Sequence, residues 1–308
     1  MKKLFLMAVA AIMAIGVSAQ QTVKKVRLYK GNTVVTEQNY AELDSIVFVD
    51  VPAGTLSGEF SISATEKVRF SQGNLQYQAS TDTWRFAEHQ WDMVGMGYGQ
   101  TNESNYCYIG GTVENSDNRQ ISSSYAGWID LFGWGTGNNP TNTSTSYSDY
   151  PTFVDWGVNK IKNGGNTANQ WRTLTYDEWY YLFYTRTNAS NLRGQATVNG
   201  ITGYVFLADG VDPASLGFKA SPNNWTTNDY TVEEWSQLEA VGAVFLPAAG
   251  ARDGAEVDYV GYSGYYWSAT PYDEYGAYFL FFYSDYADPN SWSSRRYGLS
   301  VRLVQDFE

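Results

Sequence analysis

Cysteine and histidine are almost absent from this sequence, which has one residue of each, Cys107 and His89. A single cysteine forms no disulfide within the chain, and it cannot build a zinc site or a redox pair from cysteines alone. Triads of the Ser-His-Asp or Cys-His type would have to use His89 or Cys107, and neither has a nucleophile-elbow pattern around it. We therefore expect stability to come from packing.

Charge is also scarce, and basic charge most of all. Charged residues make up 17% of the chain, with 20 Lys and Arg against 32 Asp and Glu and a formal net charge of -12. An acidic chain without a basic stripe is a poor partner for nucleic acid or for anionic lipid. We therefore expect no nucleic-acid ligand.

Long apolar runs are confined to the N-terminus. Lys2 and Lys3 precede an apolar run from Leu4 to Gly16 that is short for a membrane span, and small residues follow at Val17-Ser18-Ala19. This pattern predicts a signal peptide over residues 1–19. The mature chain is then expected in the periplasm, at the cell surface or outside the cell, with no transmembrane segment.

Aromatic residues, in contrast, are abundant at 17% of the chain, with 25 Tyr and 11 Trp. Many Tyr, Trp, Gly and Asn with little charge are typical of an extracellular β-rich protein. Turn signals and strand patterns predict a small β module at 20–51, a linker at 52–57 and a main domain at 58–308. In the main domain, we expect successive strands at 58–86. Long loops at 93–165 should pack on three buried tryptophans, Trp128, Trp134 and Trp156.

Two helices are expected, and each begins at a capping box. The boxes pair Thr175 with Glu178 and Thr231 with Glu234, and Gly242 marks the exit of the second helix. The apolar positions that follow at helical spacing are Trp179, Leu182 and Phe183 in the first helix and Trp235, Leu238 and Val241 in the second.

The tail predicts three strands, at 265–270, 276–284 and 297–304, joined by loops at 270–276 and 285–296. In the middle strand, alternation places Phe279 and Phe281 on one face. It places Tyr278, Leu280 and Phe282 on the other face. The alternation does not say which face is buried.

Five segments, in the order WRTLTYDEWYYLF, FLPAAGARDG, GYYWSAT, AYFLFF and RRYGLSVRLV, resemble a large bacterial family of exported proteins with a C-type-lectin-like fold. That family includes the Fibrobacter succinogenes major paralogous domain group. The segments are also similar to the variable proteins of diversity-generating retroelements. They are more distantly similar to formylglycine-generating enzymes, which depend on a cysteine pair that one cysteine cannot supply. Segments similar to ELDSIVF precede such domains in gut-bacterial surface proteins.

The resemblance covers residues 58–308 and implies an α+β fold. The expected architecture is a C-type-lectin-like domain with two helices and small antiparallel sheets, preceded by a short β module. The resemblance further implies that Trp267 and Arg302 are framework residues. It places the ligand face between them, from Tyr272 to Arg296.

The composition of that segment points the same way independently of the resemblance. Tyr and Ser with scattered Asp, Asn and Trp are typical of antibody paratopes, because Tyr offers a large amphipathic contact with few torsions to freeze. The candidate ligand-binding residues are Tyr272, Asp273, Tyr275, Tyr283, Asp285, Tyr286, Asn290, Trp292 and Arg295.

We expect a non-catalytic protein, not an enzyme, that presents this surface to a protein or glycan on a neighbouring surface. No cofactor is expected. The weaker alternative of a calcium ion rests on Asp285 and Asp288, and on the triplets Ser221-Pro222-Asn223 and Asp288-Pro289-Asn290.

Two other functions stay open. The chain could be a structural or adhesin subunit of a cell-surface or fimbrial assembly. It could also be an enzyme of unknown chemistry, since a carboxylate pair for glycoside hydrolysis needs no motif. If the tail is diversified by a retroelement, we expect a near-identical template beside the gene.

Overall fold

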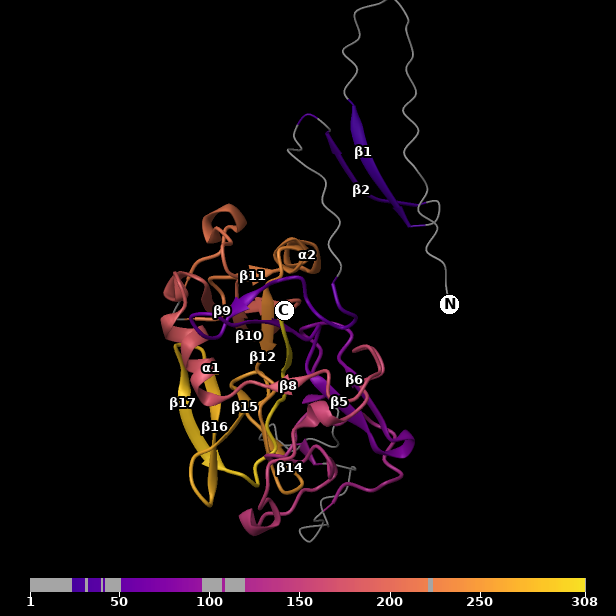
Figure 1. The fold of residues 1–308 in the computed structure, drawn as a ribbon, viewed down its shortest axis with the longest axis vertical. Coiled ribbons are helices and arrows are strands. Elements are labelled where there is room, and N and C mark those ends of the chain that lie inside the picture. The colour runs from indigo at the N-terminus through magenta and orange to yellow at the C-terminus, as the bar shows by residue number, and fades with distance from the viewer. Residues whose placement is uncertain are drawn as a thin grey trace, which may run out of the picture. The chain divides into compact units, whose positions relative to one another are not determined.

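A computed structural model describes residues 24–30, 33–39, 41, 51–95, 107–108, 120–220 and 224–307 (Figure 1). The chain divides into two compact units, Met1–Asp50 and Val51–Glu308. In the first unit, β1 (Lys25–Lys30) and β2 (Thr33–Asn39) pair in antiparallel orientation. The expected signal peptide and the triplet 221–223 lie outside the described residues.

Small sheets dominate the second unit, and the described strands form five of them. Two sheets have four strands. The strand order in the first is β3 (Phe60–Ser61), β4 (Lys67–Phe70), β18 (Leu303–Asp306), β8 (Arg172–Thr173). The strand order in the second is β11 (Asp229–Tyr230), β9 (Arg193–Val198), β10 (Ile201–Phe206), β12 (Val244–Pro247). A two-stranded sheet pairs β5 (Leu75–Gln78) with β6 (Thr83–Phe86). One three-stranded sheet has the order β13 (Ala251–Asp253), β14 (Glu256–Asp258), β7 (Cys107–Tyr108), and the other has the order β15 (Gly264–Pro271), β16 (Gly276–Tyr283), β17 (Tyr286–Ser294).

Helix is a minor component of the described residues. The α-helices are α1 (Tyr176–Tyr180), continued by the π-helical turn η7 (Tyr181–Thr185), and α2 (Val232–Ala240). The described residues are therefore mostly β, and the expected α+β fold class is wrong. A capping box fixes where a helix begins but not how long it runs, and both helices here end within about three turns.

The starts of both helices are confirmed in detail. Thr175 accepts a hydrogen bond from the Glu178 amide and Thr231 accepts one from the Glu234 amide, and both reciprocal bonds are present. The predicted apolar positions are buried except Val241, which is 41% exposed. Val241 lies at the C-cap of α2, just before Gly242 turns the chain with a φ of +84°, so it has left the helical face.

The sheet β15–β16–β17 lies between two hydrophobic cores. One face of β16 sends Phe279 into a core that also holds Trp267, while the other face sends Leu280 and Phe282 into a second core with Tyr266. Both faces of the Phe-rich strand are therefore largely buried. The sequence left open which face is buried; both are, apart from Tyr278 on one face and Phe281 on the other, which are half-buried.

The two expected framework residues lie in the core. Trp267 is 1% exposed, and its indole N–H donates to the Phe132 carbonyl at 2.7 Å. Arg302 is also 1% exposed and donates to Gln90 Oε1 at 2.8 Å. Burial lowers the pKa of the Arg302 guanidinium to about 10.

Irregular segments between residues 120 and 171 pack on aromatic side chains. Trp134 and Trp156 are buried as expected. Trp128 is not, because it lies half-buried under the guanidinium of Arg85, which is 3.7 Å from the ring centroid. A cation over its ring replaces the apolar cover that we expected.

Candidate ligand-binding surface

The candidate segment is a β-hairpin rather than a loop on a frame. Strands β16 and β17 are joined by a two-residue turn at Ser284-Asp285, with Tyr283 paired to Tyr286. The expected loop at 285–296 is therefore mostly strand. Its alternation is hidden in the sequence by a register shift opposite Leu280 and by Pro289, which an edge strand tolerates.

The turn that enters β16 is shaped by two of the candidate residues. Asp273 Oδ1 accepts hydrogen bonds from the amides of Tyr275 at 2.8 Å and Gly276 at 2.7 Å. Arg295 is 8% exposed, donates to the carbonyls of Asp273 and Gly276, and lies over the Trp134 ring. Burial lowers the pKa of Arg295. Asp273 and Arg295 therefore hold the turn in place.

An unbroken row of aromatic rings runs from the hairpin to α1, and we call it the aromatic row. Its members, in spatial order, are Trp292, Tyr272, Tyr278, Tyr176, Tyr180 and Tyr184. Successive centroid distances are 4.3, 5.3, 4.3, 5.9 and 5.0 Å. The Trp292 and Tyr272 rings are stacked with an interplanar angle of 8°. Distances of this size are those of favourable aromatic pairs.

Most of the aromatic row is open to solvent. Trp292 is 51% exposed, Tyr184 47%, Tyr272 44% and Tyr180 43%. Tyr176 and Tyr278 are half-buried between them. The row is therefore a contiguous exposed aromatic patch, not a set of scattered surface residues.

Helix α1 and the π-helical turn η7 that continues it supply half of this row, and residue spacing explains why. Tyr176, Tyr180 and Tyr184 follow one another at intervals of four, so they share one helical face. The apolar side chains of the same segment, Trp179, Leu182 and Phe183, are buried. Helix α1 lies beside β16 and β17 (Figure 1), which brings its tyrosine face against Tyr278.

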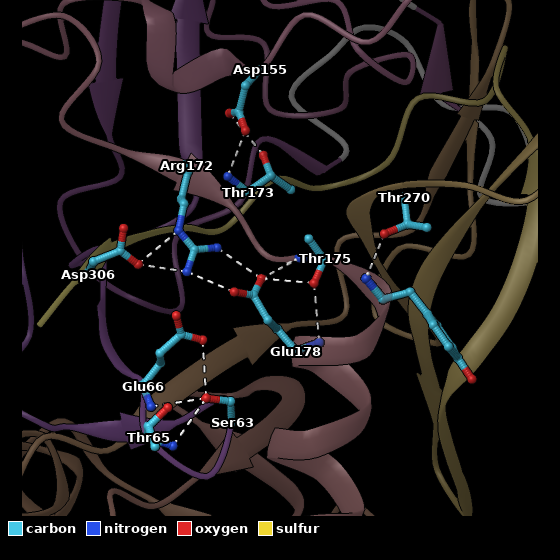
Figure 2. A network of polar contacts seen from close by, with 11 residues as sticks. Ser63, Thr65, Glu66, Asp155, Arg172, Thr173, Thr175, Glu178, Thr270 and Asp306 are labelled. Carbon is cyan, nitrogen blue, oxygen red and sulfur yellow. Dashed lines mark hydrogen bonds and ion pairs between the residues drawn. The ribbon is translucent and has the colours of Figure 1, made fainter.

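A network of polar contacts holds the start of α1 (Figure 2). The Arg172 guanidinium lies between two carboxylates, 2.8 Å from Glu178 Oε1 and 2.7 Å from Asp306 Oδ1. Glu178 Oε2 also accepts from the Thr175 amide at 2.7 Å, which closes the capping box. Burial acts to lower the pKa of Arg172, but its hydrogen bonds to Glu178 and Asp306 and the charges of these carboxylates together raise it.

Further contacts hold β8, which leads into α1, and the first residue of α1 (Figure 2). The carboxylate of Asp155 accepts from both the amide and the hydroxyl of Thr173, at 2.9 and 3.1 Å. The hydroxyl of Thr270, in β15, accepts from the Tyr176 amide at 3.0 Å. The first turn of the tyrosine face is therefore bonded directly to the sheet that carries Trp292.

Asp288 stands where the aromatic row meets the tip of the hairpin. Its Oδ1 accepts from the Tyr184 hydroxyl at 3.4 Å and its Oδ2 accepts from the Tyr286 hydroxyl at 3.1 Å. Burial and the nearby carboxylate raise the pKa of Tyr184 to about 12 and raise the pKa of Tyr286. Tyr286 in turn stacks on Tyr283 with centroids 5.5 Å apart.

The structure does not bring all nine candidate residues together. Tyr272 and Trp292 lie in the aromatic row, and Tyr283 and Tyr286 form a pair at the hairpin tip. Tyr275 packs instead on Tyr147, 4.7 Å away. Two further candidates, Asp285 in the turn and Asn290 on β17, are exposed.

Sequence reasoning missed the tyrosines of α1, although their interval of four is a visible signal. It also missed Tyr278 as a member of the surface. Asp288 was considered only as a calcium ligand. Its two oxygens accept from two phenols and from the Asn290 amide.

Other kinds of site were sought in the described part of the chain. No group of three or more His, Cys, Asp or Glu there lies in an arrangement that could hold a metal ion. No helix there has the length and apolar character needed to cross a membrane. A cavity of about 440 Å³ contains none of the nine candidates and is lined by Trp91, Asp92, Met93, Val94, Gly95, Asn199, Ile201 and Val260.

A family model described as "Domain of unknown function (DUF8237)" matches residues 216–304. That stretch includes the hairpin and all nine candidate residues, but not α1. Comparison with curated proteins and with solved structures gives no match. The resemblance described from the sequence motifs therefore stays a prediction.

Proposed function

We propose that this protein is an exported, non-catalytic ligand-binding protein that presents the aromatic row to a protein or a glycan. The observation that carries the proposal is the continuity of the row, in which six aromatic rings from two separate parts of the chain form one exposed patch. Export rests on the N-terminal segment, whose pattern is that of a signal peptide.

The physical argument concerns the cost of exposing these rings. Each large aromatic side chain left in water forgoes the stabilisation of burial, about 1.5–3 kcal/mol for a full side chain. Contiguous patches of this kind on a soluble protein mark contact surfaces, and Tyr and Trp dominate the residues that contribute most to binding. Tyr also offers a hydroxyl for hydrogen bonding at the rim of such a contact.

The rigidity of the row adds to the argument. The network around Arg172 and Glu178 fixes α1, and the Asp273 turn fixes Tyr272. A surface that is ordered before binding loses less conformational entropy when a ligand arrives. The aromatic row is therefore built as a binding surface would be, with ordered rings on hydrogen-bonded supports.

The test is a binding screen of the mature chain against envelope proteins and a glycan array, followed by a double variant, Tyr272→Ala with Trp292→Ala. We expect any ligand found to bind the double variant at least tenfold more weakly, since each such residue contributes on the order of 1 kcal/mol or more. The control is Tyr259→Ala with Tyr262→Ala, a pair that is 53% and 63% exposed and lies outside the row. Loss of binding in the control but not in the row variant refutes the proposal.

A further inference from the structure

The segments that build the aromatic row have a one-sided charge. Residues 176–185 and 272–294 contain six carboxylates, Asp177, Glu178, Asp273, Glu274, Asp285 and Asp288, and no Lys, Arg or His. Glu178 is neutralised by Arg172. The other five are exposed or half-exposed. Asp177 and Asp288 interact with rings of the row, whereas Glu274 interacts with Tyr275 and Asp285 lies in the turn at the hairpin tip. A ligand on this surface therefore meets more carboxylates than cations, and the cation nearest the row is Arg193 at its Tyr184 end.

The carboxylates act on the rings themselves. The pKa of the Tyr176 phenol is raised by burial first, then by its neighbours Tyr278 and Tyr180, and then by Asp177 and Asp288. Both carboxylates are therefore close enough to interact electrostatically with Tyr176 in the middle of the row. The faces of the rings add the negative side of their quadrupoles to the same field.

The protein already holds one cation against the end of this row. The guanidinium of Arg193 lies 3.7 Å from the Phe183 ring centroid and 5.5 Å from the Tyr184 ring centroid. It donates to the Phe183 carbonyl and the Tyr204 hydroxyl and is half-buried. A guanidinium over an aromatic face is therefore compatible with the local geometry at Tyr184.

We propose that the aromatic row binds a Lys- or Arg-rich segment of a partner protein, with cationic side chains over the rings and paired with Asp177 and Asp288. This inference rests on the proposed function, that the row binds a ligand, and adds the chemistry of that ligand. An extended basic segment satisfies both features at once, because cation–π contact and ion pairing favour the same groups. A neutral glycan would use the rings but not the charge.

The test uses three probes on the mature chain: a peptide of repeated Arg-Gly-Gly units, the same peptide with Glu in place of Arg, and a neutral β-linked hexasaccharide. We expect the Arg peptide alone to bind, and to bind about tenfold more weakly once ionic strength rises from about 0.05 M to about 0.5 M. The double variant Tyr272→Ala with Trp292→Ala keeps every charge and should weaken this binding about fivefold or more.

Charge at the row is separated from overall charge by a matched pair of variants. Asp177→Asn with Asp288→Asn should weaken binding of the Arg peptide about fivefold or more. Asp229→Asn with Glu233→Gln removes the same net charge from exposed positions on β11 and α2 and should leave binding unchanged. If Asp288→Asn disturbs folding, as judged by near-ultraviolet circular dichroism, Asp177→Asn with Asp285→Asn takes its place.

The outcomes separate this inference from the proposed function. If the Asp177 and Asp288 variant and the Asp229 and Glu233 variant weaken binding of the Arg peptide equally, the peptide responds only to the overall charge of the protein. That result overturns the inference. Binding of the hexasaccharide, lost with Tyr272 and Trp292, also overturns it but supports the proposed function. If neither these probes nor any ligand from the screen responds to the Tyr272 and Trp292 variant, both proposals fail.

Discussion

Replacing Arg172 by Met tests the account of how α1 is held. The guanidinium makes contacts of 2.8 and 2.9 Å with Glu178, and of 2.7 and 2.9 Å with Asp306. The Glu178 side chain is only 16% exposed, whereas that of Asp306 is 65% exposed. The bond to Glu178 should therefore carry about 1.5–3 kcal/mol and the bond to Asp306 about 0–1 kcal/mol.

We expect a net loss of about 2 kcal/mol in the free energy of unfolding, because Glu178 keeps its bonds to Thr175 and Met preserves the packing of the aliphatic stem. With an m value of about 2–3 kcal/mol/M, the urea midpoint should fall by about 0.7–1 M. The control is Lys67→Met, whose pair with Glu59 spans 3.4 Å between side chains that are 41% and 34% exposed. This control should cost about 0–0.5 kcal/mol. Equal midpoint shifts in the two variants would refute the reasoning.

Two further predictions concern glycine and alkaline pH. Gly242→Ala should destabilise the fold by at least about 2 kcal/mol more than Gly210→Ala, measured by urea unfolding. Both glycines have positive φ, but a Cβ at Gly242 would lie 2.1 Å from Gly58 Cα, while nothing lies within 4 Å of one at Gly210. Burial is the largest of the effects that raise the pKa of Tyr77 and Tyr230 from 10.0 to about 12. The phenols of the unfolded chain therefore ionise at a lower pH than those of the folded chain. Their stabilisation should be complete below pH 10 and lost as pH rises towards 12. A urea midpoint that stays constant across this window, while phenolate absorbance rises, would contradict the assignment.

Local signals in the sequence located the local structure well. Both capping boxes are present, and Trp179, Leu182, Trp235 and Leu238 are buried as their spacing predicted. Such signals are local because a capping bond spans three residues. The fold class depends on how long each element runs and which strands pair, and these follow from tertiary contacts. The same limit explains why the α+β expectation was wrong.

The candidate surface was predicted in part. Tyr272, Tyr283, Tyr286 and Trp292 are exposed aromatics on the hairpin, as the composition indicated. The strand β17 was not found, because its bulge and Pro289 interrupt the alternation that marks a strand. The helical half of the row was not found either. The contact between Tyr176 and Tyr278 joins segments far apart in the sequence, and neither segment shows it alone.

The burial of both faces of β16 decides where this protein has room to present aromatic side chains. Phe279 packs into one core and Leu280 and Phe282 into the other, so in the middle strand of the sheet Tyr278 is the half-buried member of the row. Only the ends of the hairpin and its edge strand remain, where Tyr272, Tyr283 and Trp292 are exposed. An edge alone is too narrow for a large contact, and the tyrosine face of α1 widens it. We therefore expect the proposed binding surface to include the helix, and we expect changes at Tyr180 or Tyr184 to affect binding without disturbing the cores.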